Sequence, residues 1–105
     1  MLRKLIFFIF ALFVHNIFAQ IVINEFSASN FDSHLDNYGE YEDWVELYNT
    51  TNSDVDLNGW YLSDKANNAT KWQFPSSFIV SANSVAIVYC SGLDELVGGY
   101  AHTNF

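Results

Sequence analysis

Hydrophobic and polar positions alternate most clearly between residues 42 and 49. Val45 and Leu47 occupy every second position there, as expected for a β-strand that turns one side toward a core. The residues that share the opposite side are Trp44, Glu46 and Tyr48. We therefore expect a strand over 44–49 with one buried face and one face of aromatic and acidic side chains.

A second alternating stretch follows Asn58-Gly59, two residues that tolerate a positive φ and favour a turn. The turn predicts a strand over 60–63, with Trp60 and Leu62 on one face. Other short runs of β-branched and aromatic residues also predict strands, and these are 21–28, 70–74, 78–80, 84–90 and 101–105. A glycine-rich loop is expected over 91–100, which leaves the last strand without a later partner. Because turn signals separate short strands and no helical pattern follows residue 20, the sequence predicts an all-β sandwich.

The first nineteen residues have a different pattern. A short basic start with Arg3 and Lys4 precedes an unbroken apolar run over 5–14, and Ala19 ends the segment. This order predicts a helical secretory signal peptide over 1–19 that is cleaved before Gln20. The apolar run is about half of the roughly 20 residues that a spanning helix needs. We therefore expect a secreted or cell-surface protein with one domain over 20–105 and no membrane span after cleavage.

Charge narrows the choice of partners. The chain has 105 residues with 12 acidic and 4 basic side chains, and its length is that of one small domain. Cleavage would remove Arg3 and Lys4, so 2 basic side chains would face 12 acidic ones and the net charge would be −10. Such a surface repels phosphate backbones, so we expect no nucleic-acid partner.

Four segments in order, EDWVELYN, DLNGWYLSD, KWQFP and HTNF, resemble the lamin tail domain in the motif order of its bacterial members. That family is an immunoglobulin-like β-sandwich found in nuclear lamins and in many secreted bacterial proteins. The resemblance covers 21–105 and implies further strands after the HTNF motif. It therefore implies a sandwich that is incomplete at its C-terminus, in a chain truncated before the last strands, with an open edge.

The outward face of the 44–49 strand is the first candidate binding site. Two aromatic rings beside a carboxylate, Trp44, Glu46 and Tyr48, could contact a protein or a cell-surface glycan. Alternatively, the long polar loop over 29–41 folds over these rings and its backbone binds Glu46. The family's motif pattern also includes Asn24-Glu25 and Ser63-Asp64, which suggests a polar network of Glu25, Asp64 and Asp43.

The long loop is also a candidate calcium site, because it gathers the carboxylates of Asp32, Asp36, Glu40 and Glu42. Oxygen-rich loops of extracellular modules can hold calcium at millimolar affinity. The spacing does not match the helix-loop-helix calcium signature. The alternative is a solvated acidic loop, in which case the protein has no cofactor.

Catalytic signatures are weak. Cys90 is the only cysteine, and a cysteine that ends an apolar strand is usually buried. His102 lies in the HTNF motif, where a structural hydrogen-bonding role is expected, and the sequence has no phosphate loop, serine elbow or zinc signature. The sequence therefore predicts a secreted non-enzymatic β-sandwich module for adhesion, surface display or protein interaction. The alternative is a calcium- or carbohydrate-binding accessory domain of a larger secreted enzyme, of which this chain is a fragment.

Overall fold

The computed structural model describes residues 20–28, 30, 32 and 34–105. The predicted signal peptide over 1–19 lies outside the described residues. The described part contains no helix of the length and apolarity that a membrane crossing requires. Its secondary structure consists of nine strands: β1 Ile21–Ser27, β2 Asp43–Asn49, β3 Val55–Asp56, β4 Tyr61–Leu62, β5 Trp72–Gln73, β6 Ile79–Val80, β7 Val85–Cys90, β8 Glu95–Val97 and β9 Tyr100–His102.

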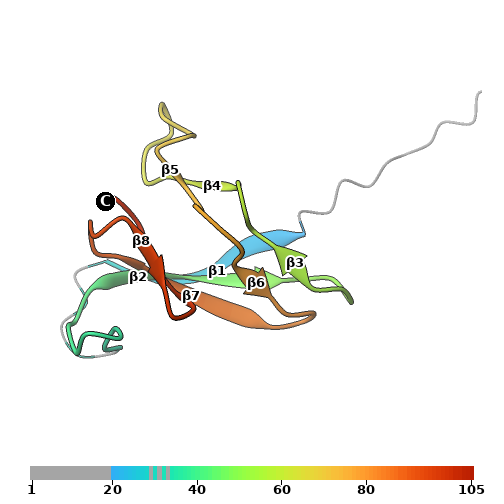
Figure 1. Ribbon diagram of the computed structural model, residues 1–105, viewed down its shortest axis with the longest axis horizontal. Coiled ribbons are helices and arrows are strands. Elements are labelled where there is room, and N and C mark those ends of the chain that lie inside the picture. The colour runs from blue at the N-terminus through green and yellow to red at the C-terminus, as the bar shows by residue number, and fades with distance from the viewer. Residues whose placement is uncertain (1–19, 29, 31, 33) are drawn as a thin grey trace, which may run out of the picture.

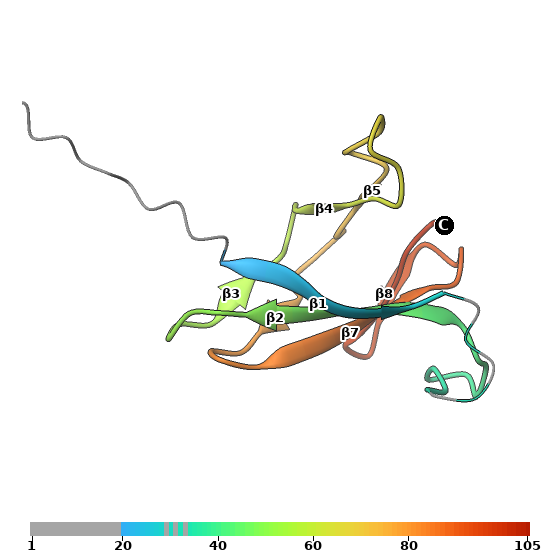
Figure 2. The same cartoon turned by 180° about the vertical axis from the view of Figure 1, so that it is seen from behind.

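Five strands form one sheet in the order β1-β2-β7-β9-β8 (Figure 1). The second layer is a long hairpin in which β3 pairs with β6 and β4 pairs with β5. Between these two pairs, Leu57 N–H donates to the carbonyl of Phe78, and Phe74 N–H donates to that of Trp60, each at 2.9 Å. The hairpin extends beyond the sheet at the β4–β5 end (Figure 2). This all-β arrangement of two layers confirms the predicted sandwich.

The core lies between the five-stranded sheet and the hairpin. The sheet contributes Leu47, Val88 and Ala101. The hairpin contributes Leu57, Trp72, Phe74, Phe78 and Val80. Val45 packs against this core and is half-buried, so the predicted inward parity of the 44–49 strand is confirmed.

Trp60 departs from the prediction, because 40% of its surface is exposed. Gly59 has a φ of +81°, and Trp60 N–H donates to the Leu57 carbonyl at 2.9 Å, so the predicted turn forms. The turn kinks one arm of the hairpin and starts no new strand at Trp60. Trp60 therefore lies before β4, and Leu62, not Trp60, packs against the core.

The C-terminal region also differs from the prediction. Residues 91–100 were expected to be a loop, but β8 lies within them and pairs with β9. The connection is Gly98-Gly99, with φ values of +60° and +82°, and such positive values suit a two-residue hairpin turn. Strand β9 also pairs in parallel with β7, so the last predicted strand has two partners.

Strand β1 contains a bulge. Ile23 pairs with Leu47 and Phe26 pairs with Val45, but Asn24 is an extra residue between the pairs. In an antiparallel pair, residues directly opposite each other project to the same face. The bulge therefore turns both Ile23 and Phe26 toward the hairpin side, although they are three positions apart.

Candidate functional site

Two adjoining hollows lie between β1 and β4. The larger has a volume of about 310 Å³ and the smaller about 240 Å³, and Ile23 and Leu62 line both. Phe26 and Phe105 line the larger hollow, and Trp60 lines the smaller one. We call the two hollows together the β1–β4 groove. Its walls are mostly apolar, and they remain open to solvent.

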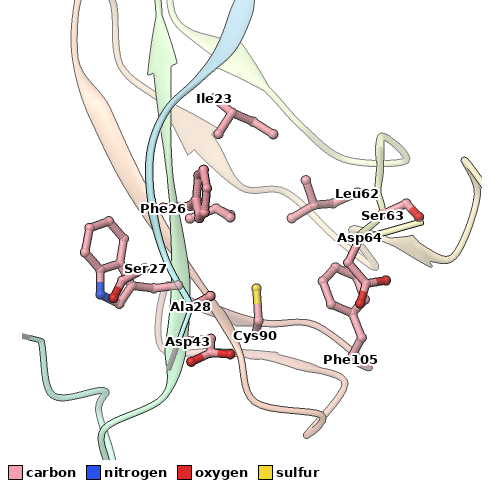
Figure 3. Close-up of a pocket in the computed structure, with 12 residues that line it drawn as sticks. Ile23, Phe26, Ser27, Ala28, Asp43, Leu62, Ser63, Asp64, Cys90 and Phe105 are labelled. Carbon is pink, nitrogen blue, oxygen red and sulfur yellow. The ribbon is translucent and has the colours of Figure 1, made fainter. Parts of the chain in front are cut away.

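Polar groups gather at one end of the groove. Asp43, Asp64 and Cys90 all line the larger hollow (Figure 3). Asp64 forms an ion pair with Lys71 at 2.7 Å, and the hydrogen bond from Lys71 is the main reason that the pKa of Asp64 lies below its ordinary value. Burial raises the pKa of the Cys90 thiol, and the nearby carboxylates of Asp43 and Asp64 raise it further. The thiol is therefore protonated at neutral pH and is a poor nucleophile.

The opposite face of the sheet is closed by residues 34–41 of the loop that precedes β2. Trp44 projects to this face and is only 4% exposed, and its ring meets the ring of His34 edge to face, with centroids 4.9 Å apart. Tyr89, directly opposite Trp44 on β7, donates from its hydroxyl to the Leu35 carbonyl at 3.2 Å. The loop thus covers Trp44, as the second of the two predicted alternatives had it for this ring.

His102 completes this covered cluster. It is fully buried and stacks on Tyr89 with centroids 5.2 Å apart. Its Nε2 lies 2.7 Å from Asn37 Oδ1, and its Nδ1 lies 2.8 Å from Ser91 Oγ. Asn37 Oδ1 can only accept, so Nε2–H donates to it, while Nδ1 is hydrogen-bonded to the Ser91 hydroxyl. A serine beside a histidine is also a nucleophile arrangement, but here Nε2 holds Asn37 of the loop and Nδ1 holds Ser91, which follows β7. We call Trp44, Tyr89 and His102 the outer cluster.

Comparison with known families decides which domain this is. The family model of the Lamin Tail Domain matches residues 18–104. The chain belongs to the lamin tail domain family. This family consists of non-enzymatic immunoglobulin-like domains, in keeping with the two-layer sandwich. Comparisons with curated proteins and with solved structures gave no match.

In the folded lamin tail domain, the residues that the sequence analysis grouped as a binding site lie in different surroundings. Trp44, Glu46 and Tyr48 share one face of β2, but Trp44 lies under the loop and the other two are half-buried. Glu46 Oε1 accepts a hydrogen bond from Asn24 Nδ2 at 2.8 Å, not from the loop backbone as the covered alternative had it. The extra residue in β1 brings Asn24 within reach.

The expected polar network is also divided. Glu25 pairs with Glu46 on the outer face, whereas Asp43 and Asp64 line the groove on the other side. Asp43 Oδ1 accepts from the backbone N–H of Asn30 at 3.1 Å. Of the predicted binding residues, Asp43, Asp64 and Trp44 line the larger hollow of the β1–β4 groove, although the Trp44 ring meets His34 of the loop.

The acidic loop residues are spread out. Asp36 is buried, and its Oδ1 accepts from the backbone N–H groups of Tyr38 and Glu40 at 2.8 and 2.9 Å. Asp32 and Glu40 are exposed, and Glu42 is half-buried. Across the described positions, no three acidic, histidine or cysteine side chains come close enough to hold a metal ion. At least one of the four carboxylates is thus used to shape the loop.

Sequence reasoning missed the main groove residues. Ile23 and Phe26 were assigned to a strand, but nothing in their pattern indicated that they share a face. The bulge that aligns them is a backbone feature, and the only signal for it is that apolar residues occur three apart in a run that otherwise reads as a strand.

Proposed function

We propose that this lamin tail domain is an exported, non-enzymatic module that binds other proteins outside the cytoplasm, in adhesion or surface display. The family supports an interaction module, and the basic start with the following apolar run supports export. The buried, fully bonded His102 and the protonated Cys90 thiol support a role without catalysis.

The β1–β4 groove is the observation that carries this proposal. Small monomeric proteins seldom expose contiguous apolar surface unless it serves an interaction. Phe26 is 69% exposed, Ile23 57% and Tyr61 51%, and these side chains lie along the groove or line it. A surface of this kind suits a protein partner.

Export is tested by producing the full chain in a host with a secretory pathway and measuring the mass of the product by mass spectrometry. We expect it outside the cytoplasm with a mass that places its first residue at Gln20. A Phe8→Asp variant should stay in the cytoplasm uncleaved, because a charge interrupts the apolar run, and the matched Phe8→Leu variant should be exported. Equal export of the two variants would contradict the proposal.

Interaction is tested by adding the fluorescently labelled chain to cells of its source. We expect saturable binding that disappears when the cell surface is first treated with a protease. Binding that survives the protease but is lost after glycosidase treatment would point to a glycan and overturn the protein-partner proposal. Turnover of ester, glycoside or phosphodiester substrates by the pure chain would overturn the non-enzymatic role.

A further inference from the structure

Residues 34–41 cover the outward face of the five-stranded sheet over one row of side chains. The row consists of Trp44, Tyr89 and His102, which are paired across β2, β7 and β9, and all three are buried. The hairpin lies on the other side of the sheet (Figure 1). Beyond this row, the outward side chains of the same strands are half-buried or exposed.

The side chains beyond the covered row are mostly apolar. The inward residues of β7, β8 and β9 belong to the core or pack against it, so the residues between them point outward. The outward apolar and aromatic side chains are Tyr48, Val85, Ile87, Val97 and Tyr100. Val85, Val97 and Tyr100 are 50%, 55% and 46% exposed, and the other two are half-buried. We call these five side chains the outer patch.

Strand β7 is apolar on both faces. Ala86 and Val88 face inward and contact the core, whereas Val85, Ile87 and Tyr89 face outward. A strand in which apolar residues do not alternate with polar ones is typical of a sheet that is covered on both faces. Tyr89 is 8% exposed and Val85 is 50% exposed. The sequence of β7 therefore suits a cover over the outer patch that the described residues do not supply.

A further strand of the same sandwich would not provide this cover. A strand joined to the edge of the five-stranded sheet would lie beside its neighbour, about 4.8 Å away, and would widen the sheet. A strand joined to the hairpin would lie on the inward side. In both cases the outer patch stays on the outside of the two layers, unlike the β1–β4 groove, which lies between them.

Two glutamates lie directly opposite each other beside the outer patch. Glu25 of β1 pairs with Glu46 of β2, and Glu46 in turn pairs with Ile87 of the patch. Like charges in this arrangement repel and destabilise the strand pair. Within the described residues neither carboxylate forms an ion pair. The lysines of the described part, Lys65 and Lys71, lie in the hairpin between β4 and β5.

A basic side chain from outside would satisfy both glutamates, because it exchanges a repulsion for two attractions. A second copy of this chain is a poor source, since residues 20–105 contain 12 acidic side chains and only Lys65 and Lys71 as basic ones. A neutral glycan would leave the repulsion in place. Another protein can supply both a cation and an apolar surface, and charge complementarity would select it.

We propose that the outer patch binds another protein whose contact surface is apolar and presents lysine or arginine to Glu25 and Glu46. This inference rests on the proposed function as an interaction module and names the chemistry of the partner. The repulsion between the two carboxylates is relieved in the complex, so some stability of the free domain is given up for binding.

Glu25→Lys separates binding from stability. The labelled chain is added to cells of its source, and its thermal unfolding is followed by circular dichroism. The new charge would face Glu46, so the Tm should rise. Binding should weaken about tenfold or more, because the partner's cation would meet a positive charge. The control Asp32→Lys makes the same change of charge at an exposed position of the loop and should leave binding unchanged.

Val85→Ser tests the apolar contact. It should weaken binding about fivefold, because it removes apolar surface from the outer patch, and it should fold because Val85 is 50% exposed. The matched control is Ile79→Ser, which removes a similarly exposed side chain, 53%, from the hairpin layer. Binding of this control should not change.

Chemical blocking of the cells tests the partner's cation. Lysine side chains at the cell surface are acetylated in one sample, and arginine side chains are modified with phenylglyoxal in another. Loss of binding after either treatment is expected, because each reagent removes the positive charge. Binding that survives both treatments would overturn the inference.

Other outcomes would also overturn it. Unchanged binding in Glu25→Lys or in Val85→Ser is one. Self-association that Val85→Ser abolishes would show that a second copy covers the outer patch. A Tm of Val85→Ser as low as that of a core variant would show that the chain itself covers it.

The same assay distinguishes this inference from the proposed function. If the unaltered chain shows no saturable binding to the cells, the proposed function fails and the inference fails with it. If binding is lost in Phe26→Ser, on the opposite face, and persists in Glu25→Lys and Val85→Ser, the proposed function stands and only the inference is removed.

Discussion

Trp44 and Phe26 lie on neighbouring strands and project to opposite faces of the same sheet, and the fold treats them in opposite ways. Residues 34–41 of the loop close over Trp44, whereas Phe26 faces the hairpin side and remains exposed. The outward-facing aromatic residue is thus buried, and the inward-facing one is mostly exposed. The position of a residue in a strand therefore decides which face of the sheet its side chain is on. Whether that face is buried depends on elements that are distant in sequence.

The largest expected effect is a difference in stability between the two aromatic positions. Trp44→Ala should lower the free energy of unfolding by about 3–5 kcal/mol, the usual cost of removing a buried large ring. Phe26→Ala should change it by about 0.5 kcal/mol or less, as is typical of exposed positions. Urea unfolding of both variants measures the difference. Similar losses at the two positions would show that the groove is closed in solution.

A smaller effect is expected from the residue that anchors the loop over Trp44. Asn30 is buried, and its Nδ2 donates to the carbonyls of His34 and Glu42 at 2.9 and 3.0 Å. Asn30→Ala should cost about 1–3 kcal/mol, because buried carbonyls lose their donors. Amide hydrogen exchange should quicken in β2 and β7 and stay unchanged in the hairpin. The exposed Asn68 serves as the control, and an equal effect of Asn68→Ala would contradict the anchoring role.

Acid should loosen the hairpin side of the molecule. Asp56 accepts from the backbone N–H groups of Asn58 and Phe78 and from the Ser77 hydroxyl, and these bonds, chiefly that of Asn58, hold the pKa of its carboxyl below the ordinary 3.8. A lowered folded pKa means that the stabilisation is complete above pH 3.8 and is lost as the pH falls through the folded pKa. Stability measured from pH 6 to pH 2 should therefore fall at the acid end, and less steeply in Asp56→Asn. A carboxyl titration by NMR at or above 3.8 would contradict this.

The smallest expected effect is that of calcium. Asp36 is engaged by loop backbone, and the other predicted ligands are spread around it, so millimolar calcium should leave the Tm unchanged. Differential scanning calorimetry with calcium, and with magnesium as the control, tests this. A rise in Tm with calcium but not with magnesium would support the predicted metal site.

Much of the sandwich could be predicted because its signals are local. Alternation of Val45 and Leu47 located β2, and the run of β-branched and aromatic residues over 70–74 located β5, in which Trp72 is buried. The apolar run over 84–90 indicated a strand, and β7 lies there, in the middle of the sheet. Signals of this kind depend on a period of two that survives wherever a strand is regular.

The candidate site could not be predicted because it depends on irregular backbone and on distant partners. The kink at Gly59 exposes Trp60, and the Gly98-Gly99 turn makes a hairpin from a stretch that composition alone marks as loop. The loop that covers Trp44 closes through contacts with His102, whose partner Asn37 is 65 positions away in sequence. Truncation before the last family strands stays a prediction.

The surplus residue in β1 has an evolutionary consequence. In an unbulged strand, positions 23 and 26 would project to opposite sides, since their separation is odd. Loss of the single codon for Asn24 would therefore exchange which of β1's side chains face the hairpin side, while β2 and β7 kept their hydrogen-bonded ladder. A one-residue insertion or deletion at the edge of the sheet can thus change which side chains line the β1–β4 groove, without any substitution in the packed interior.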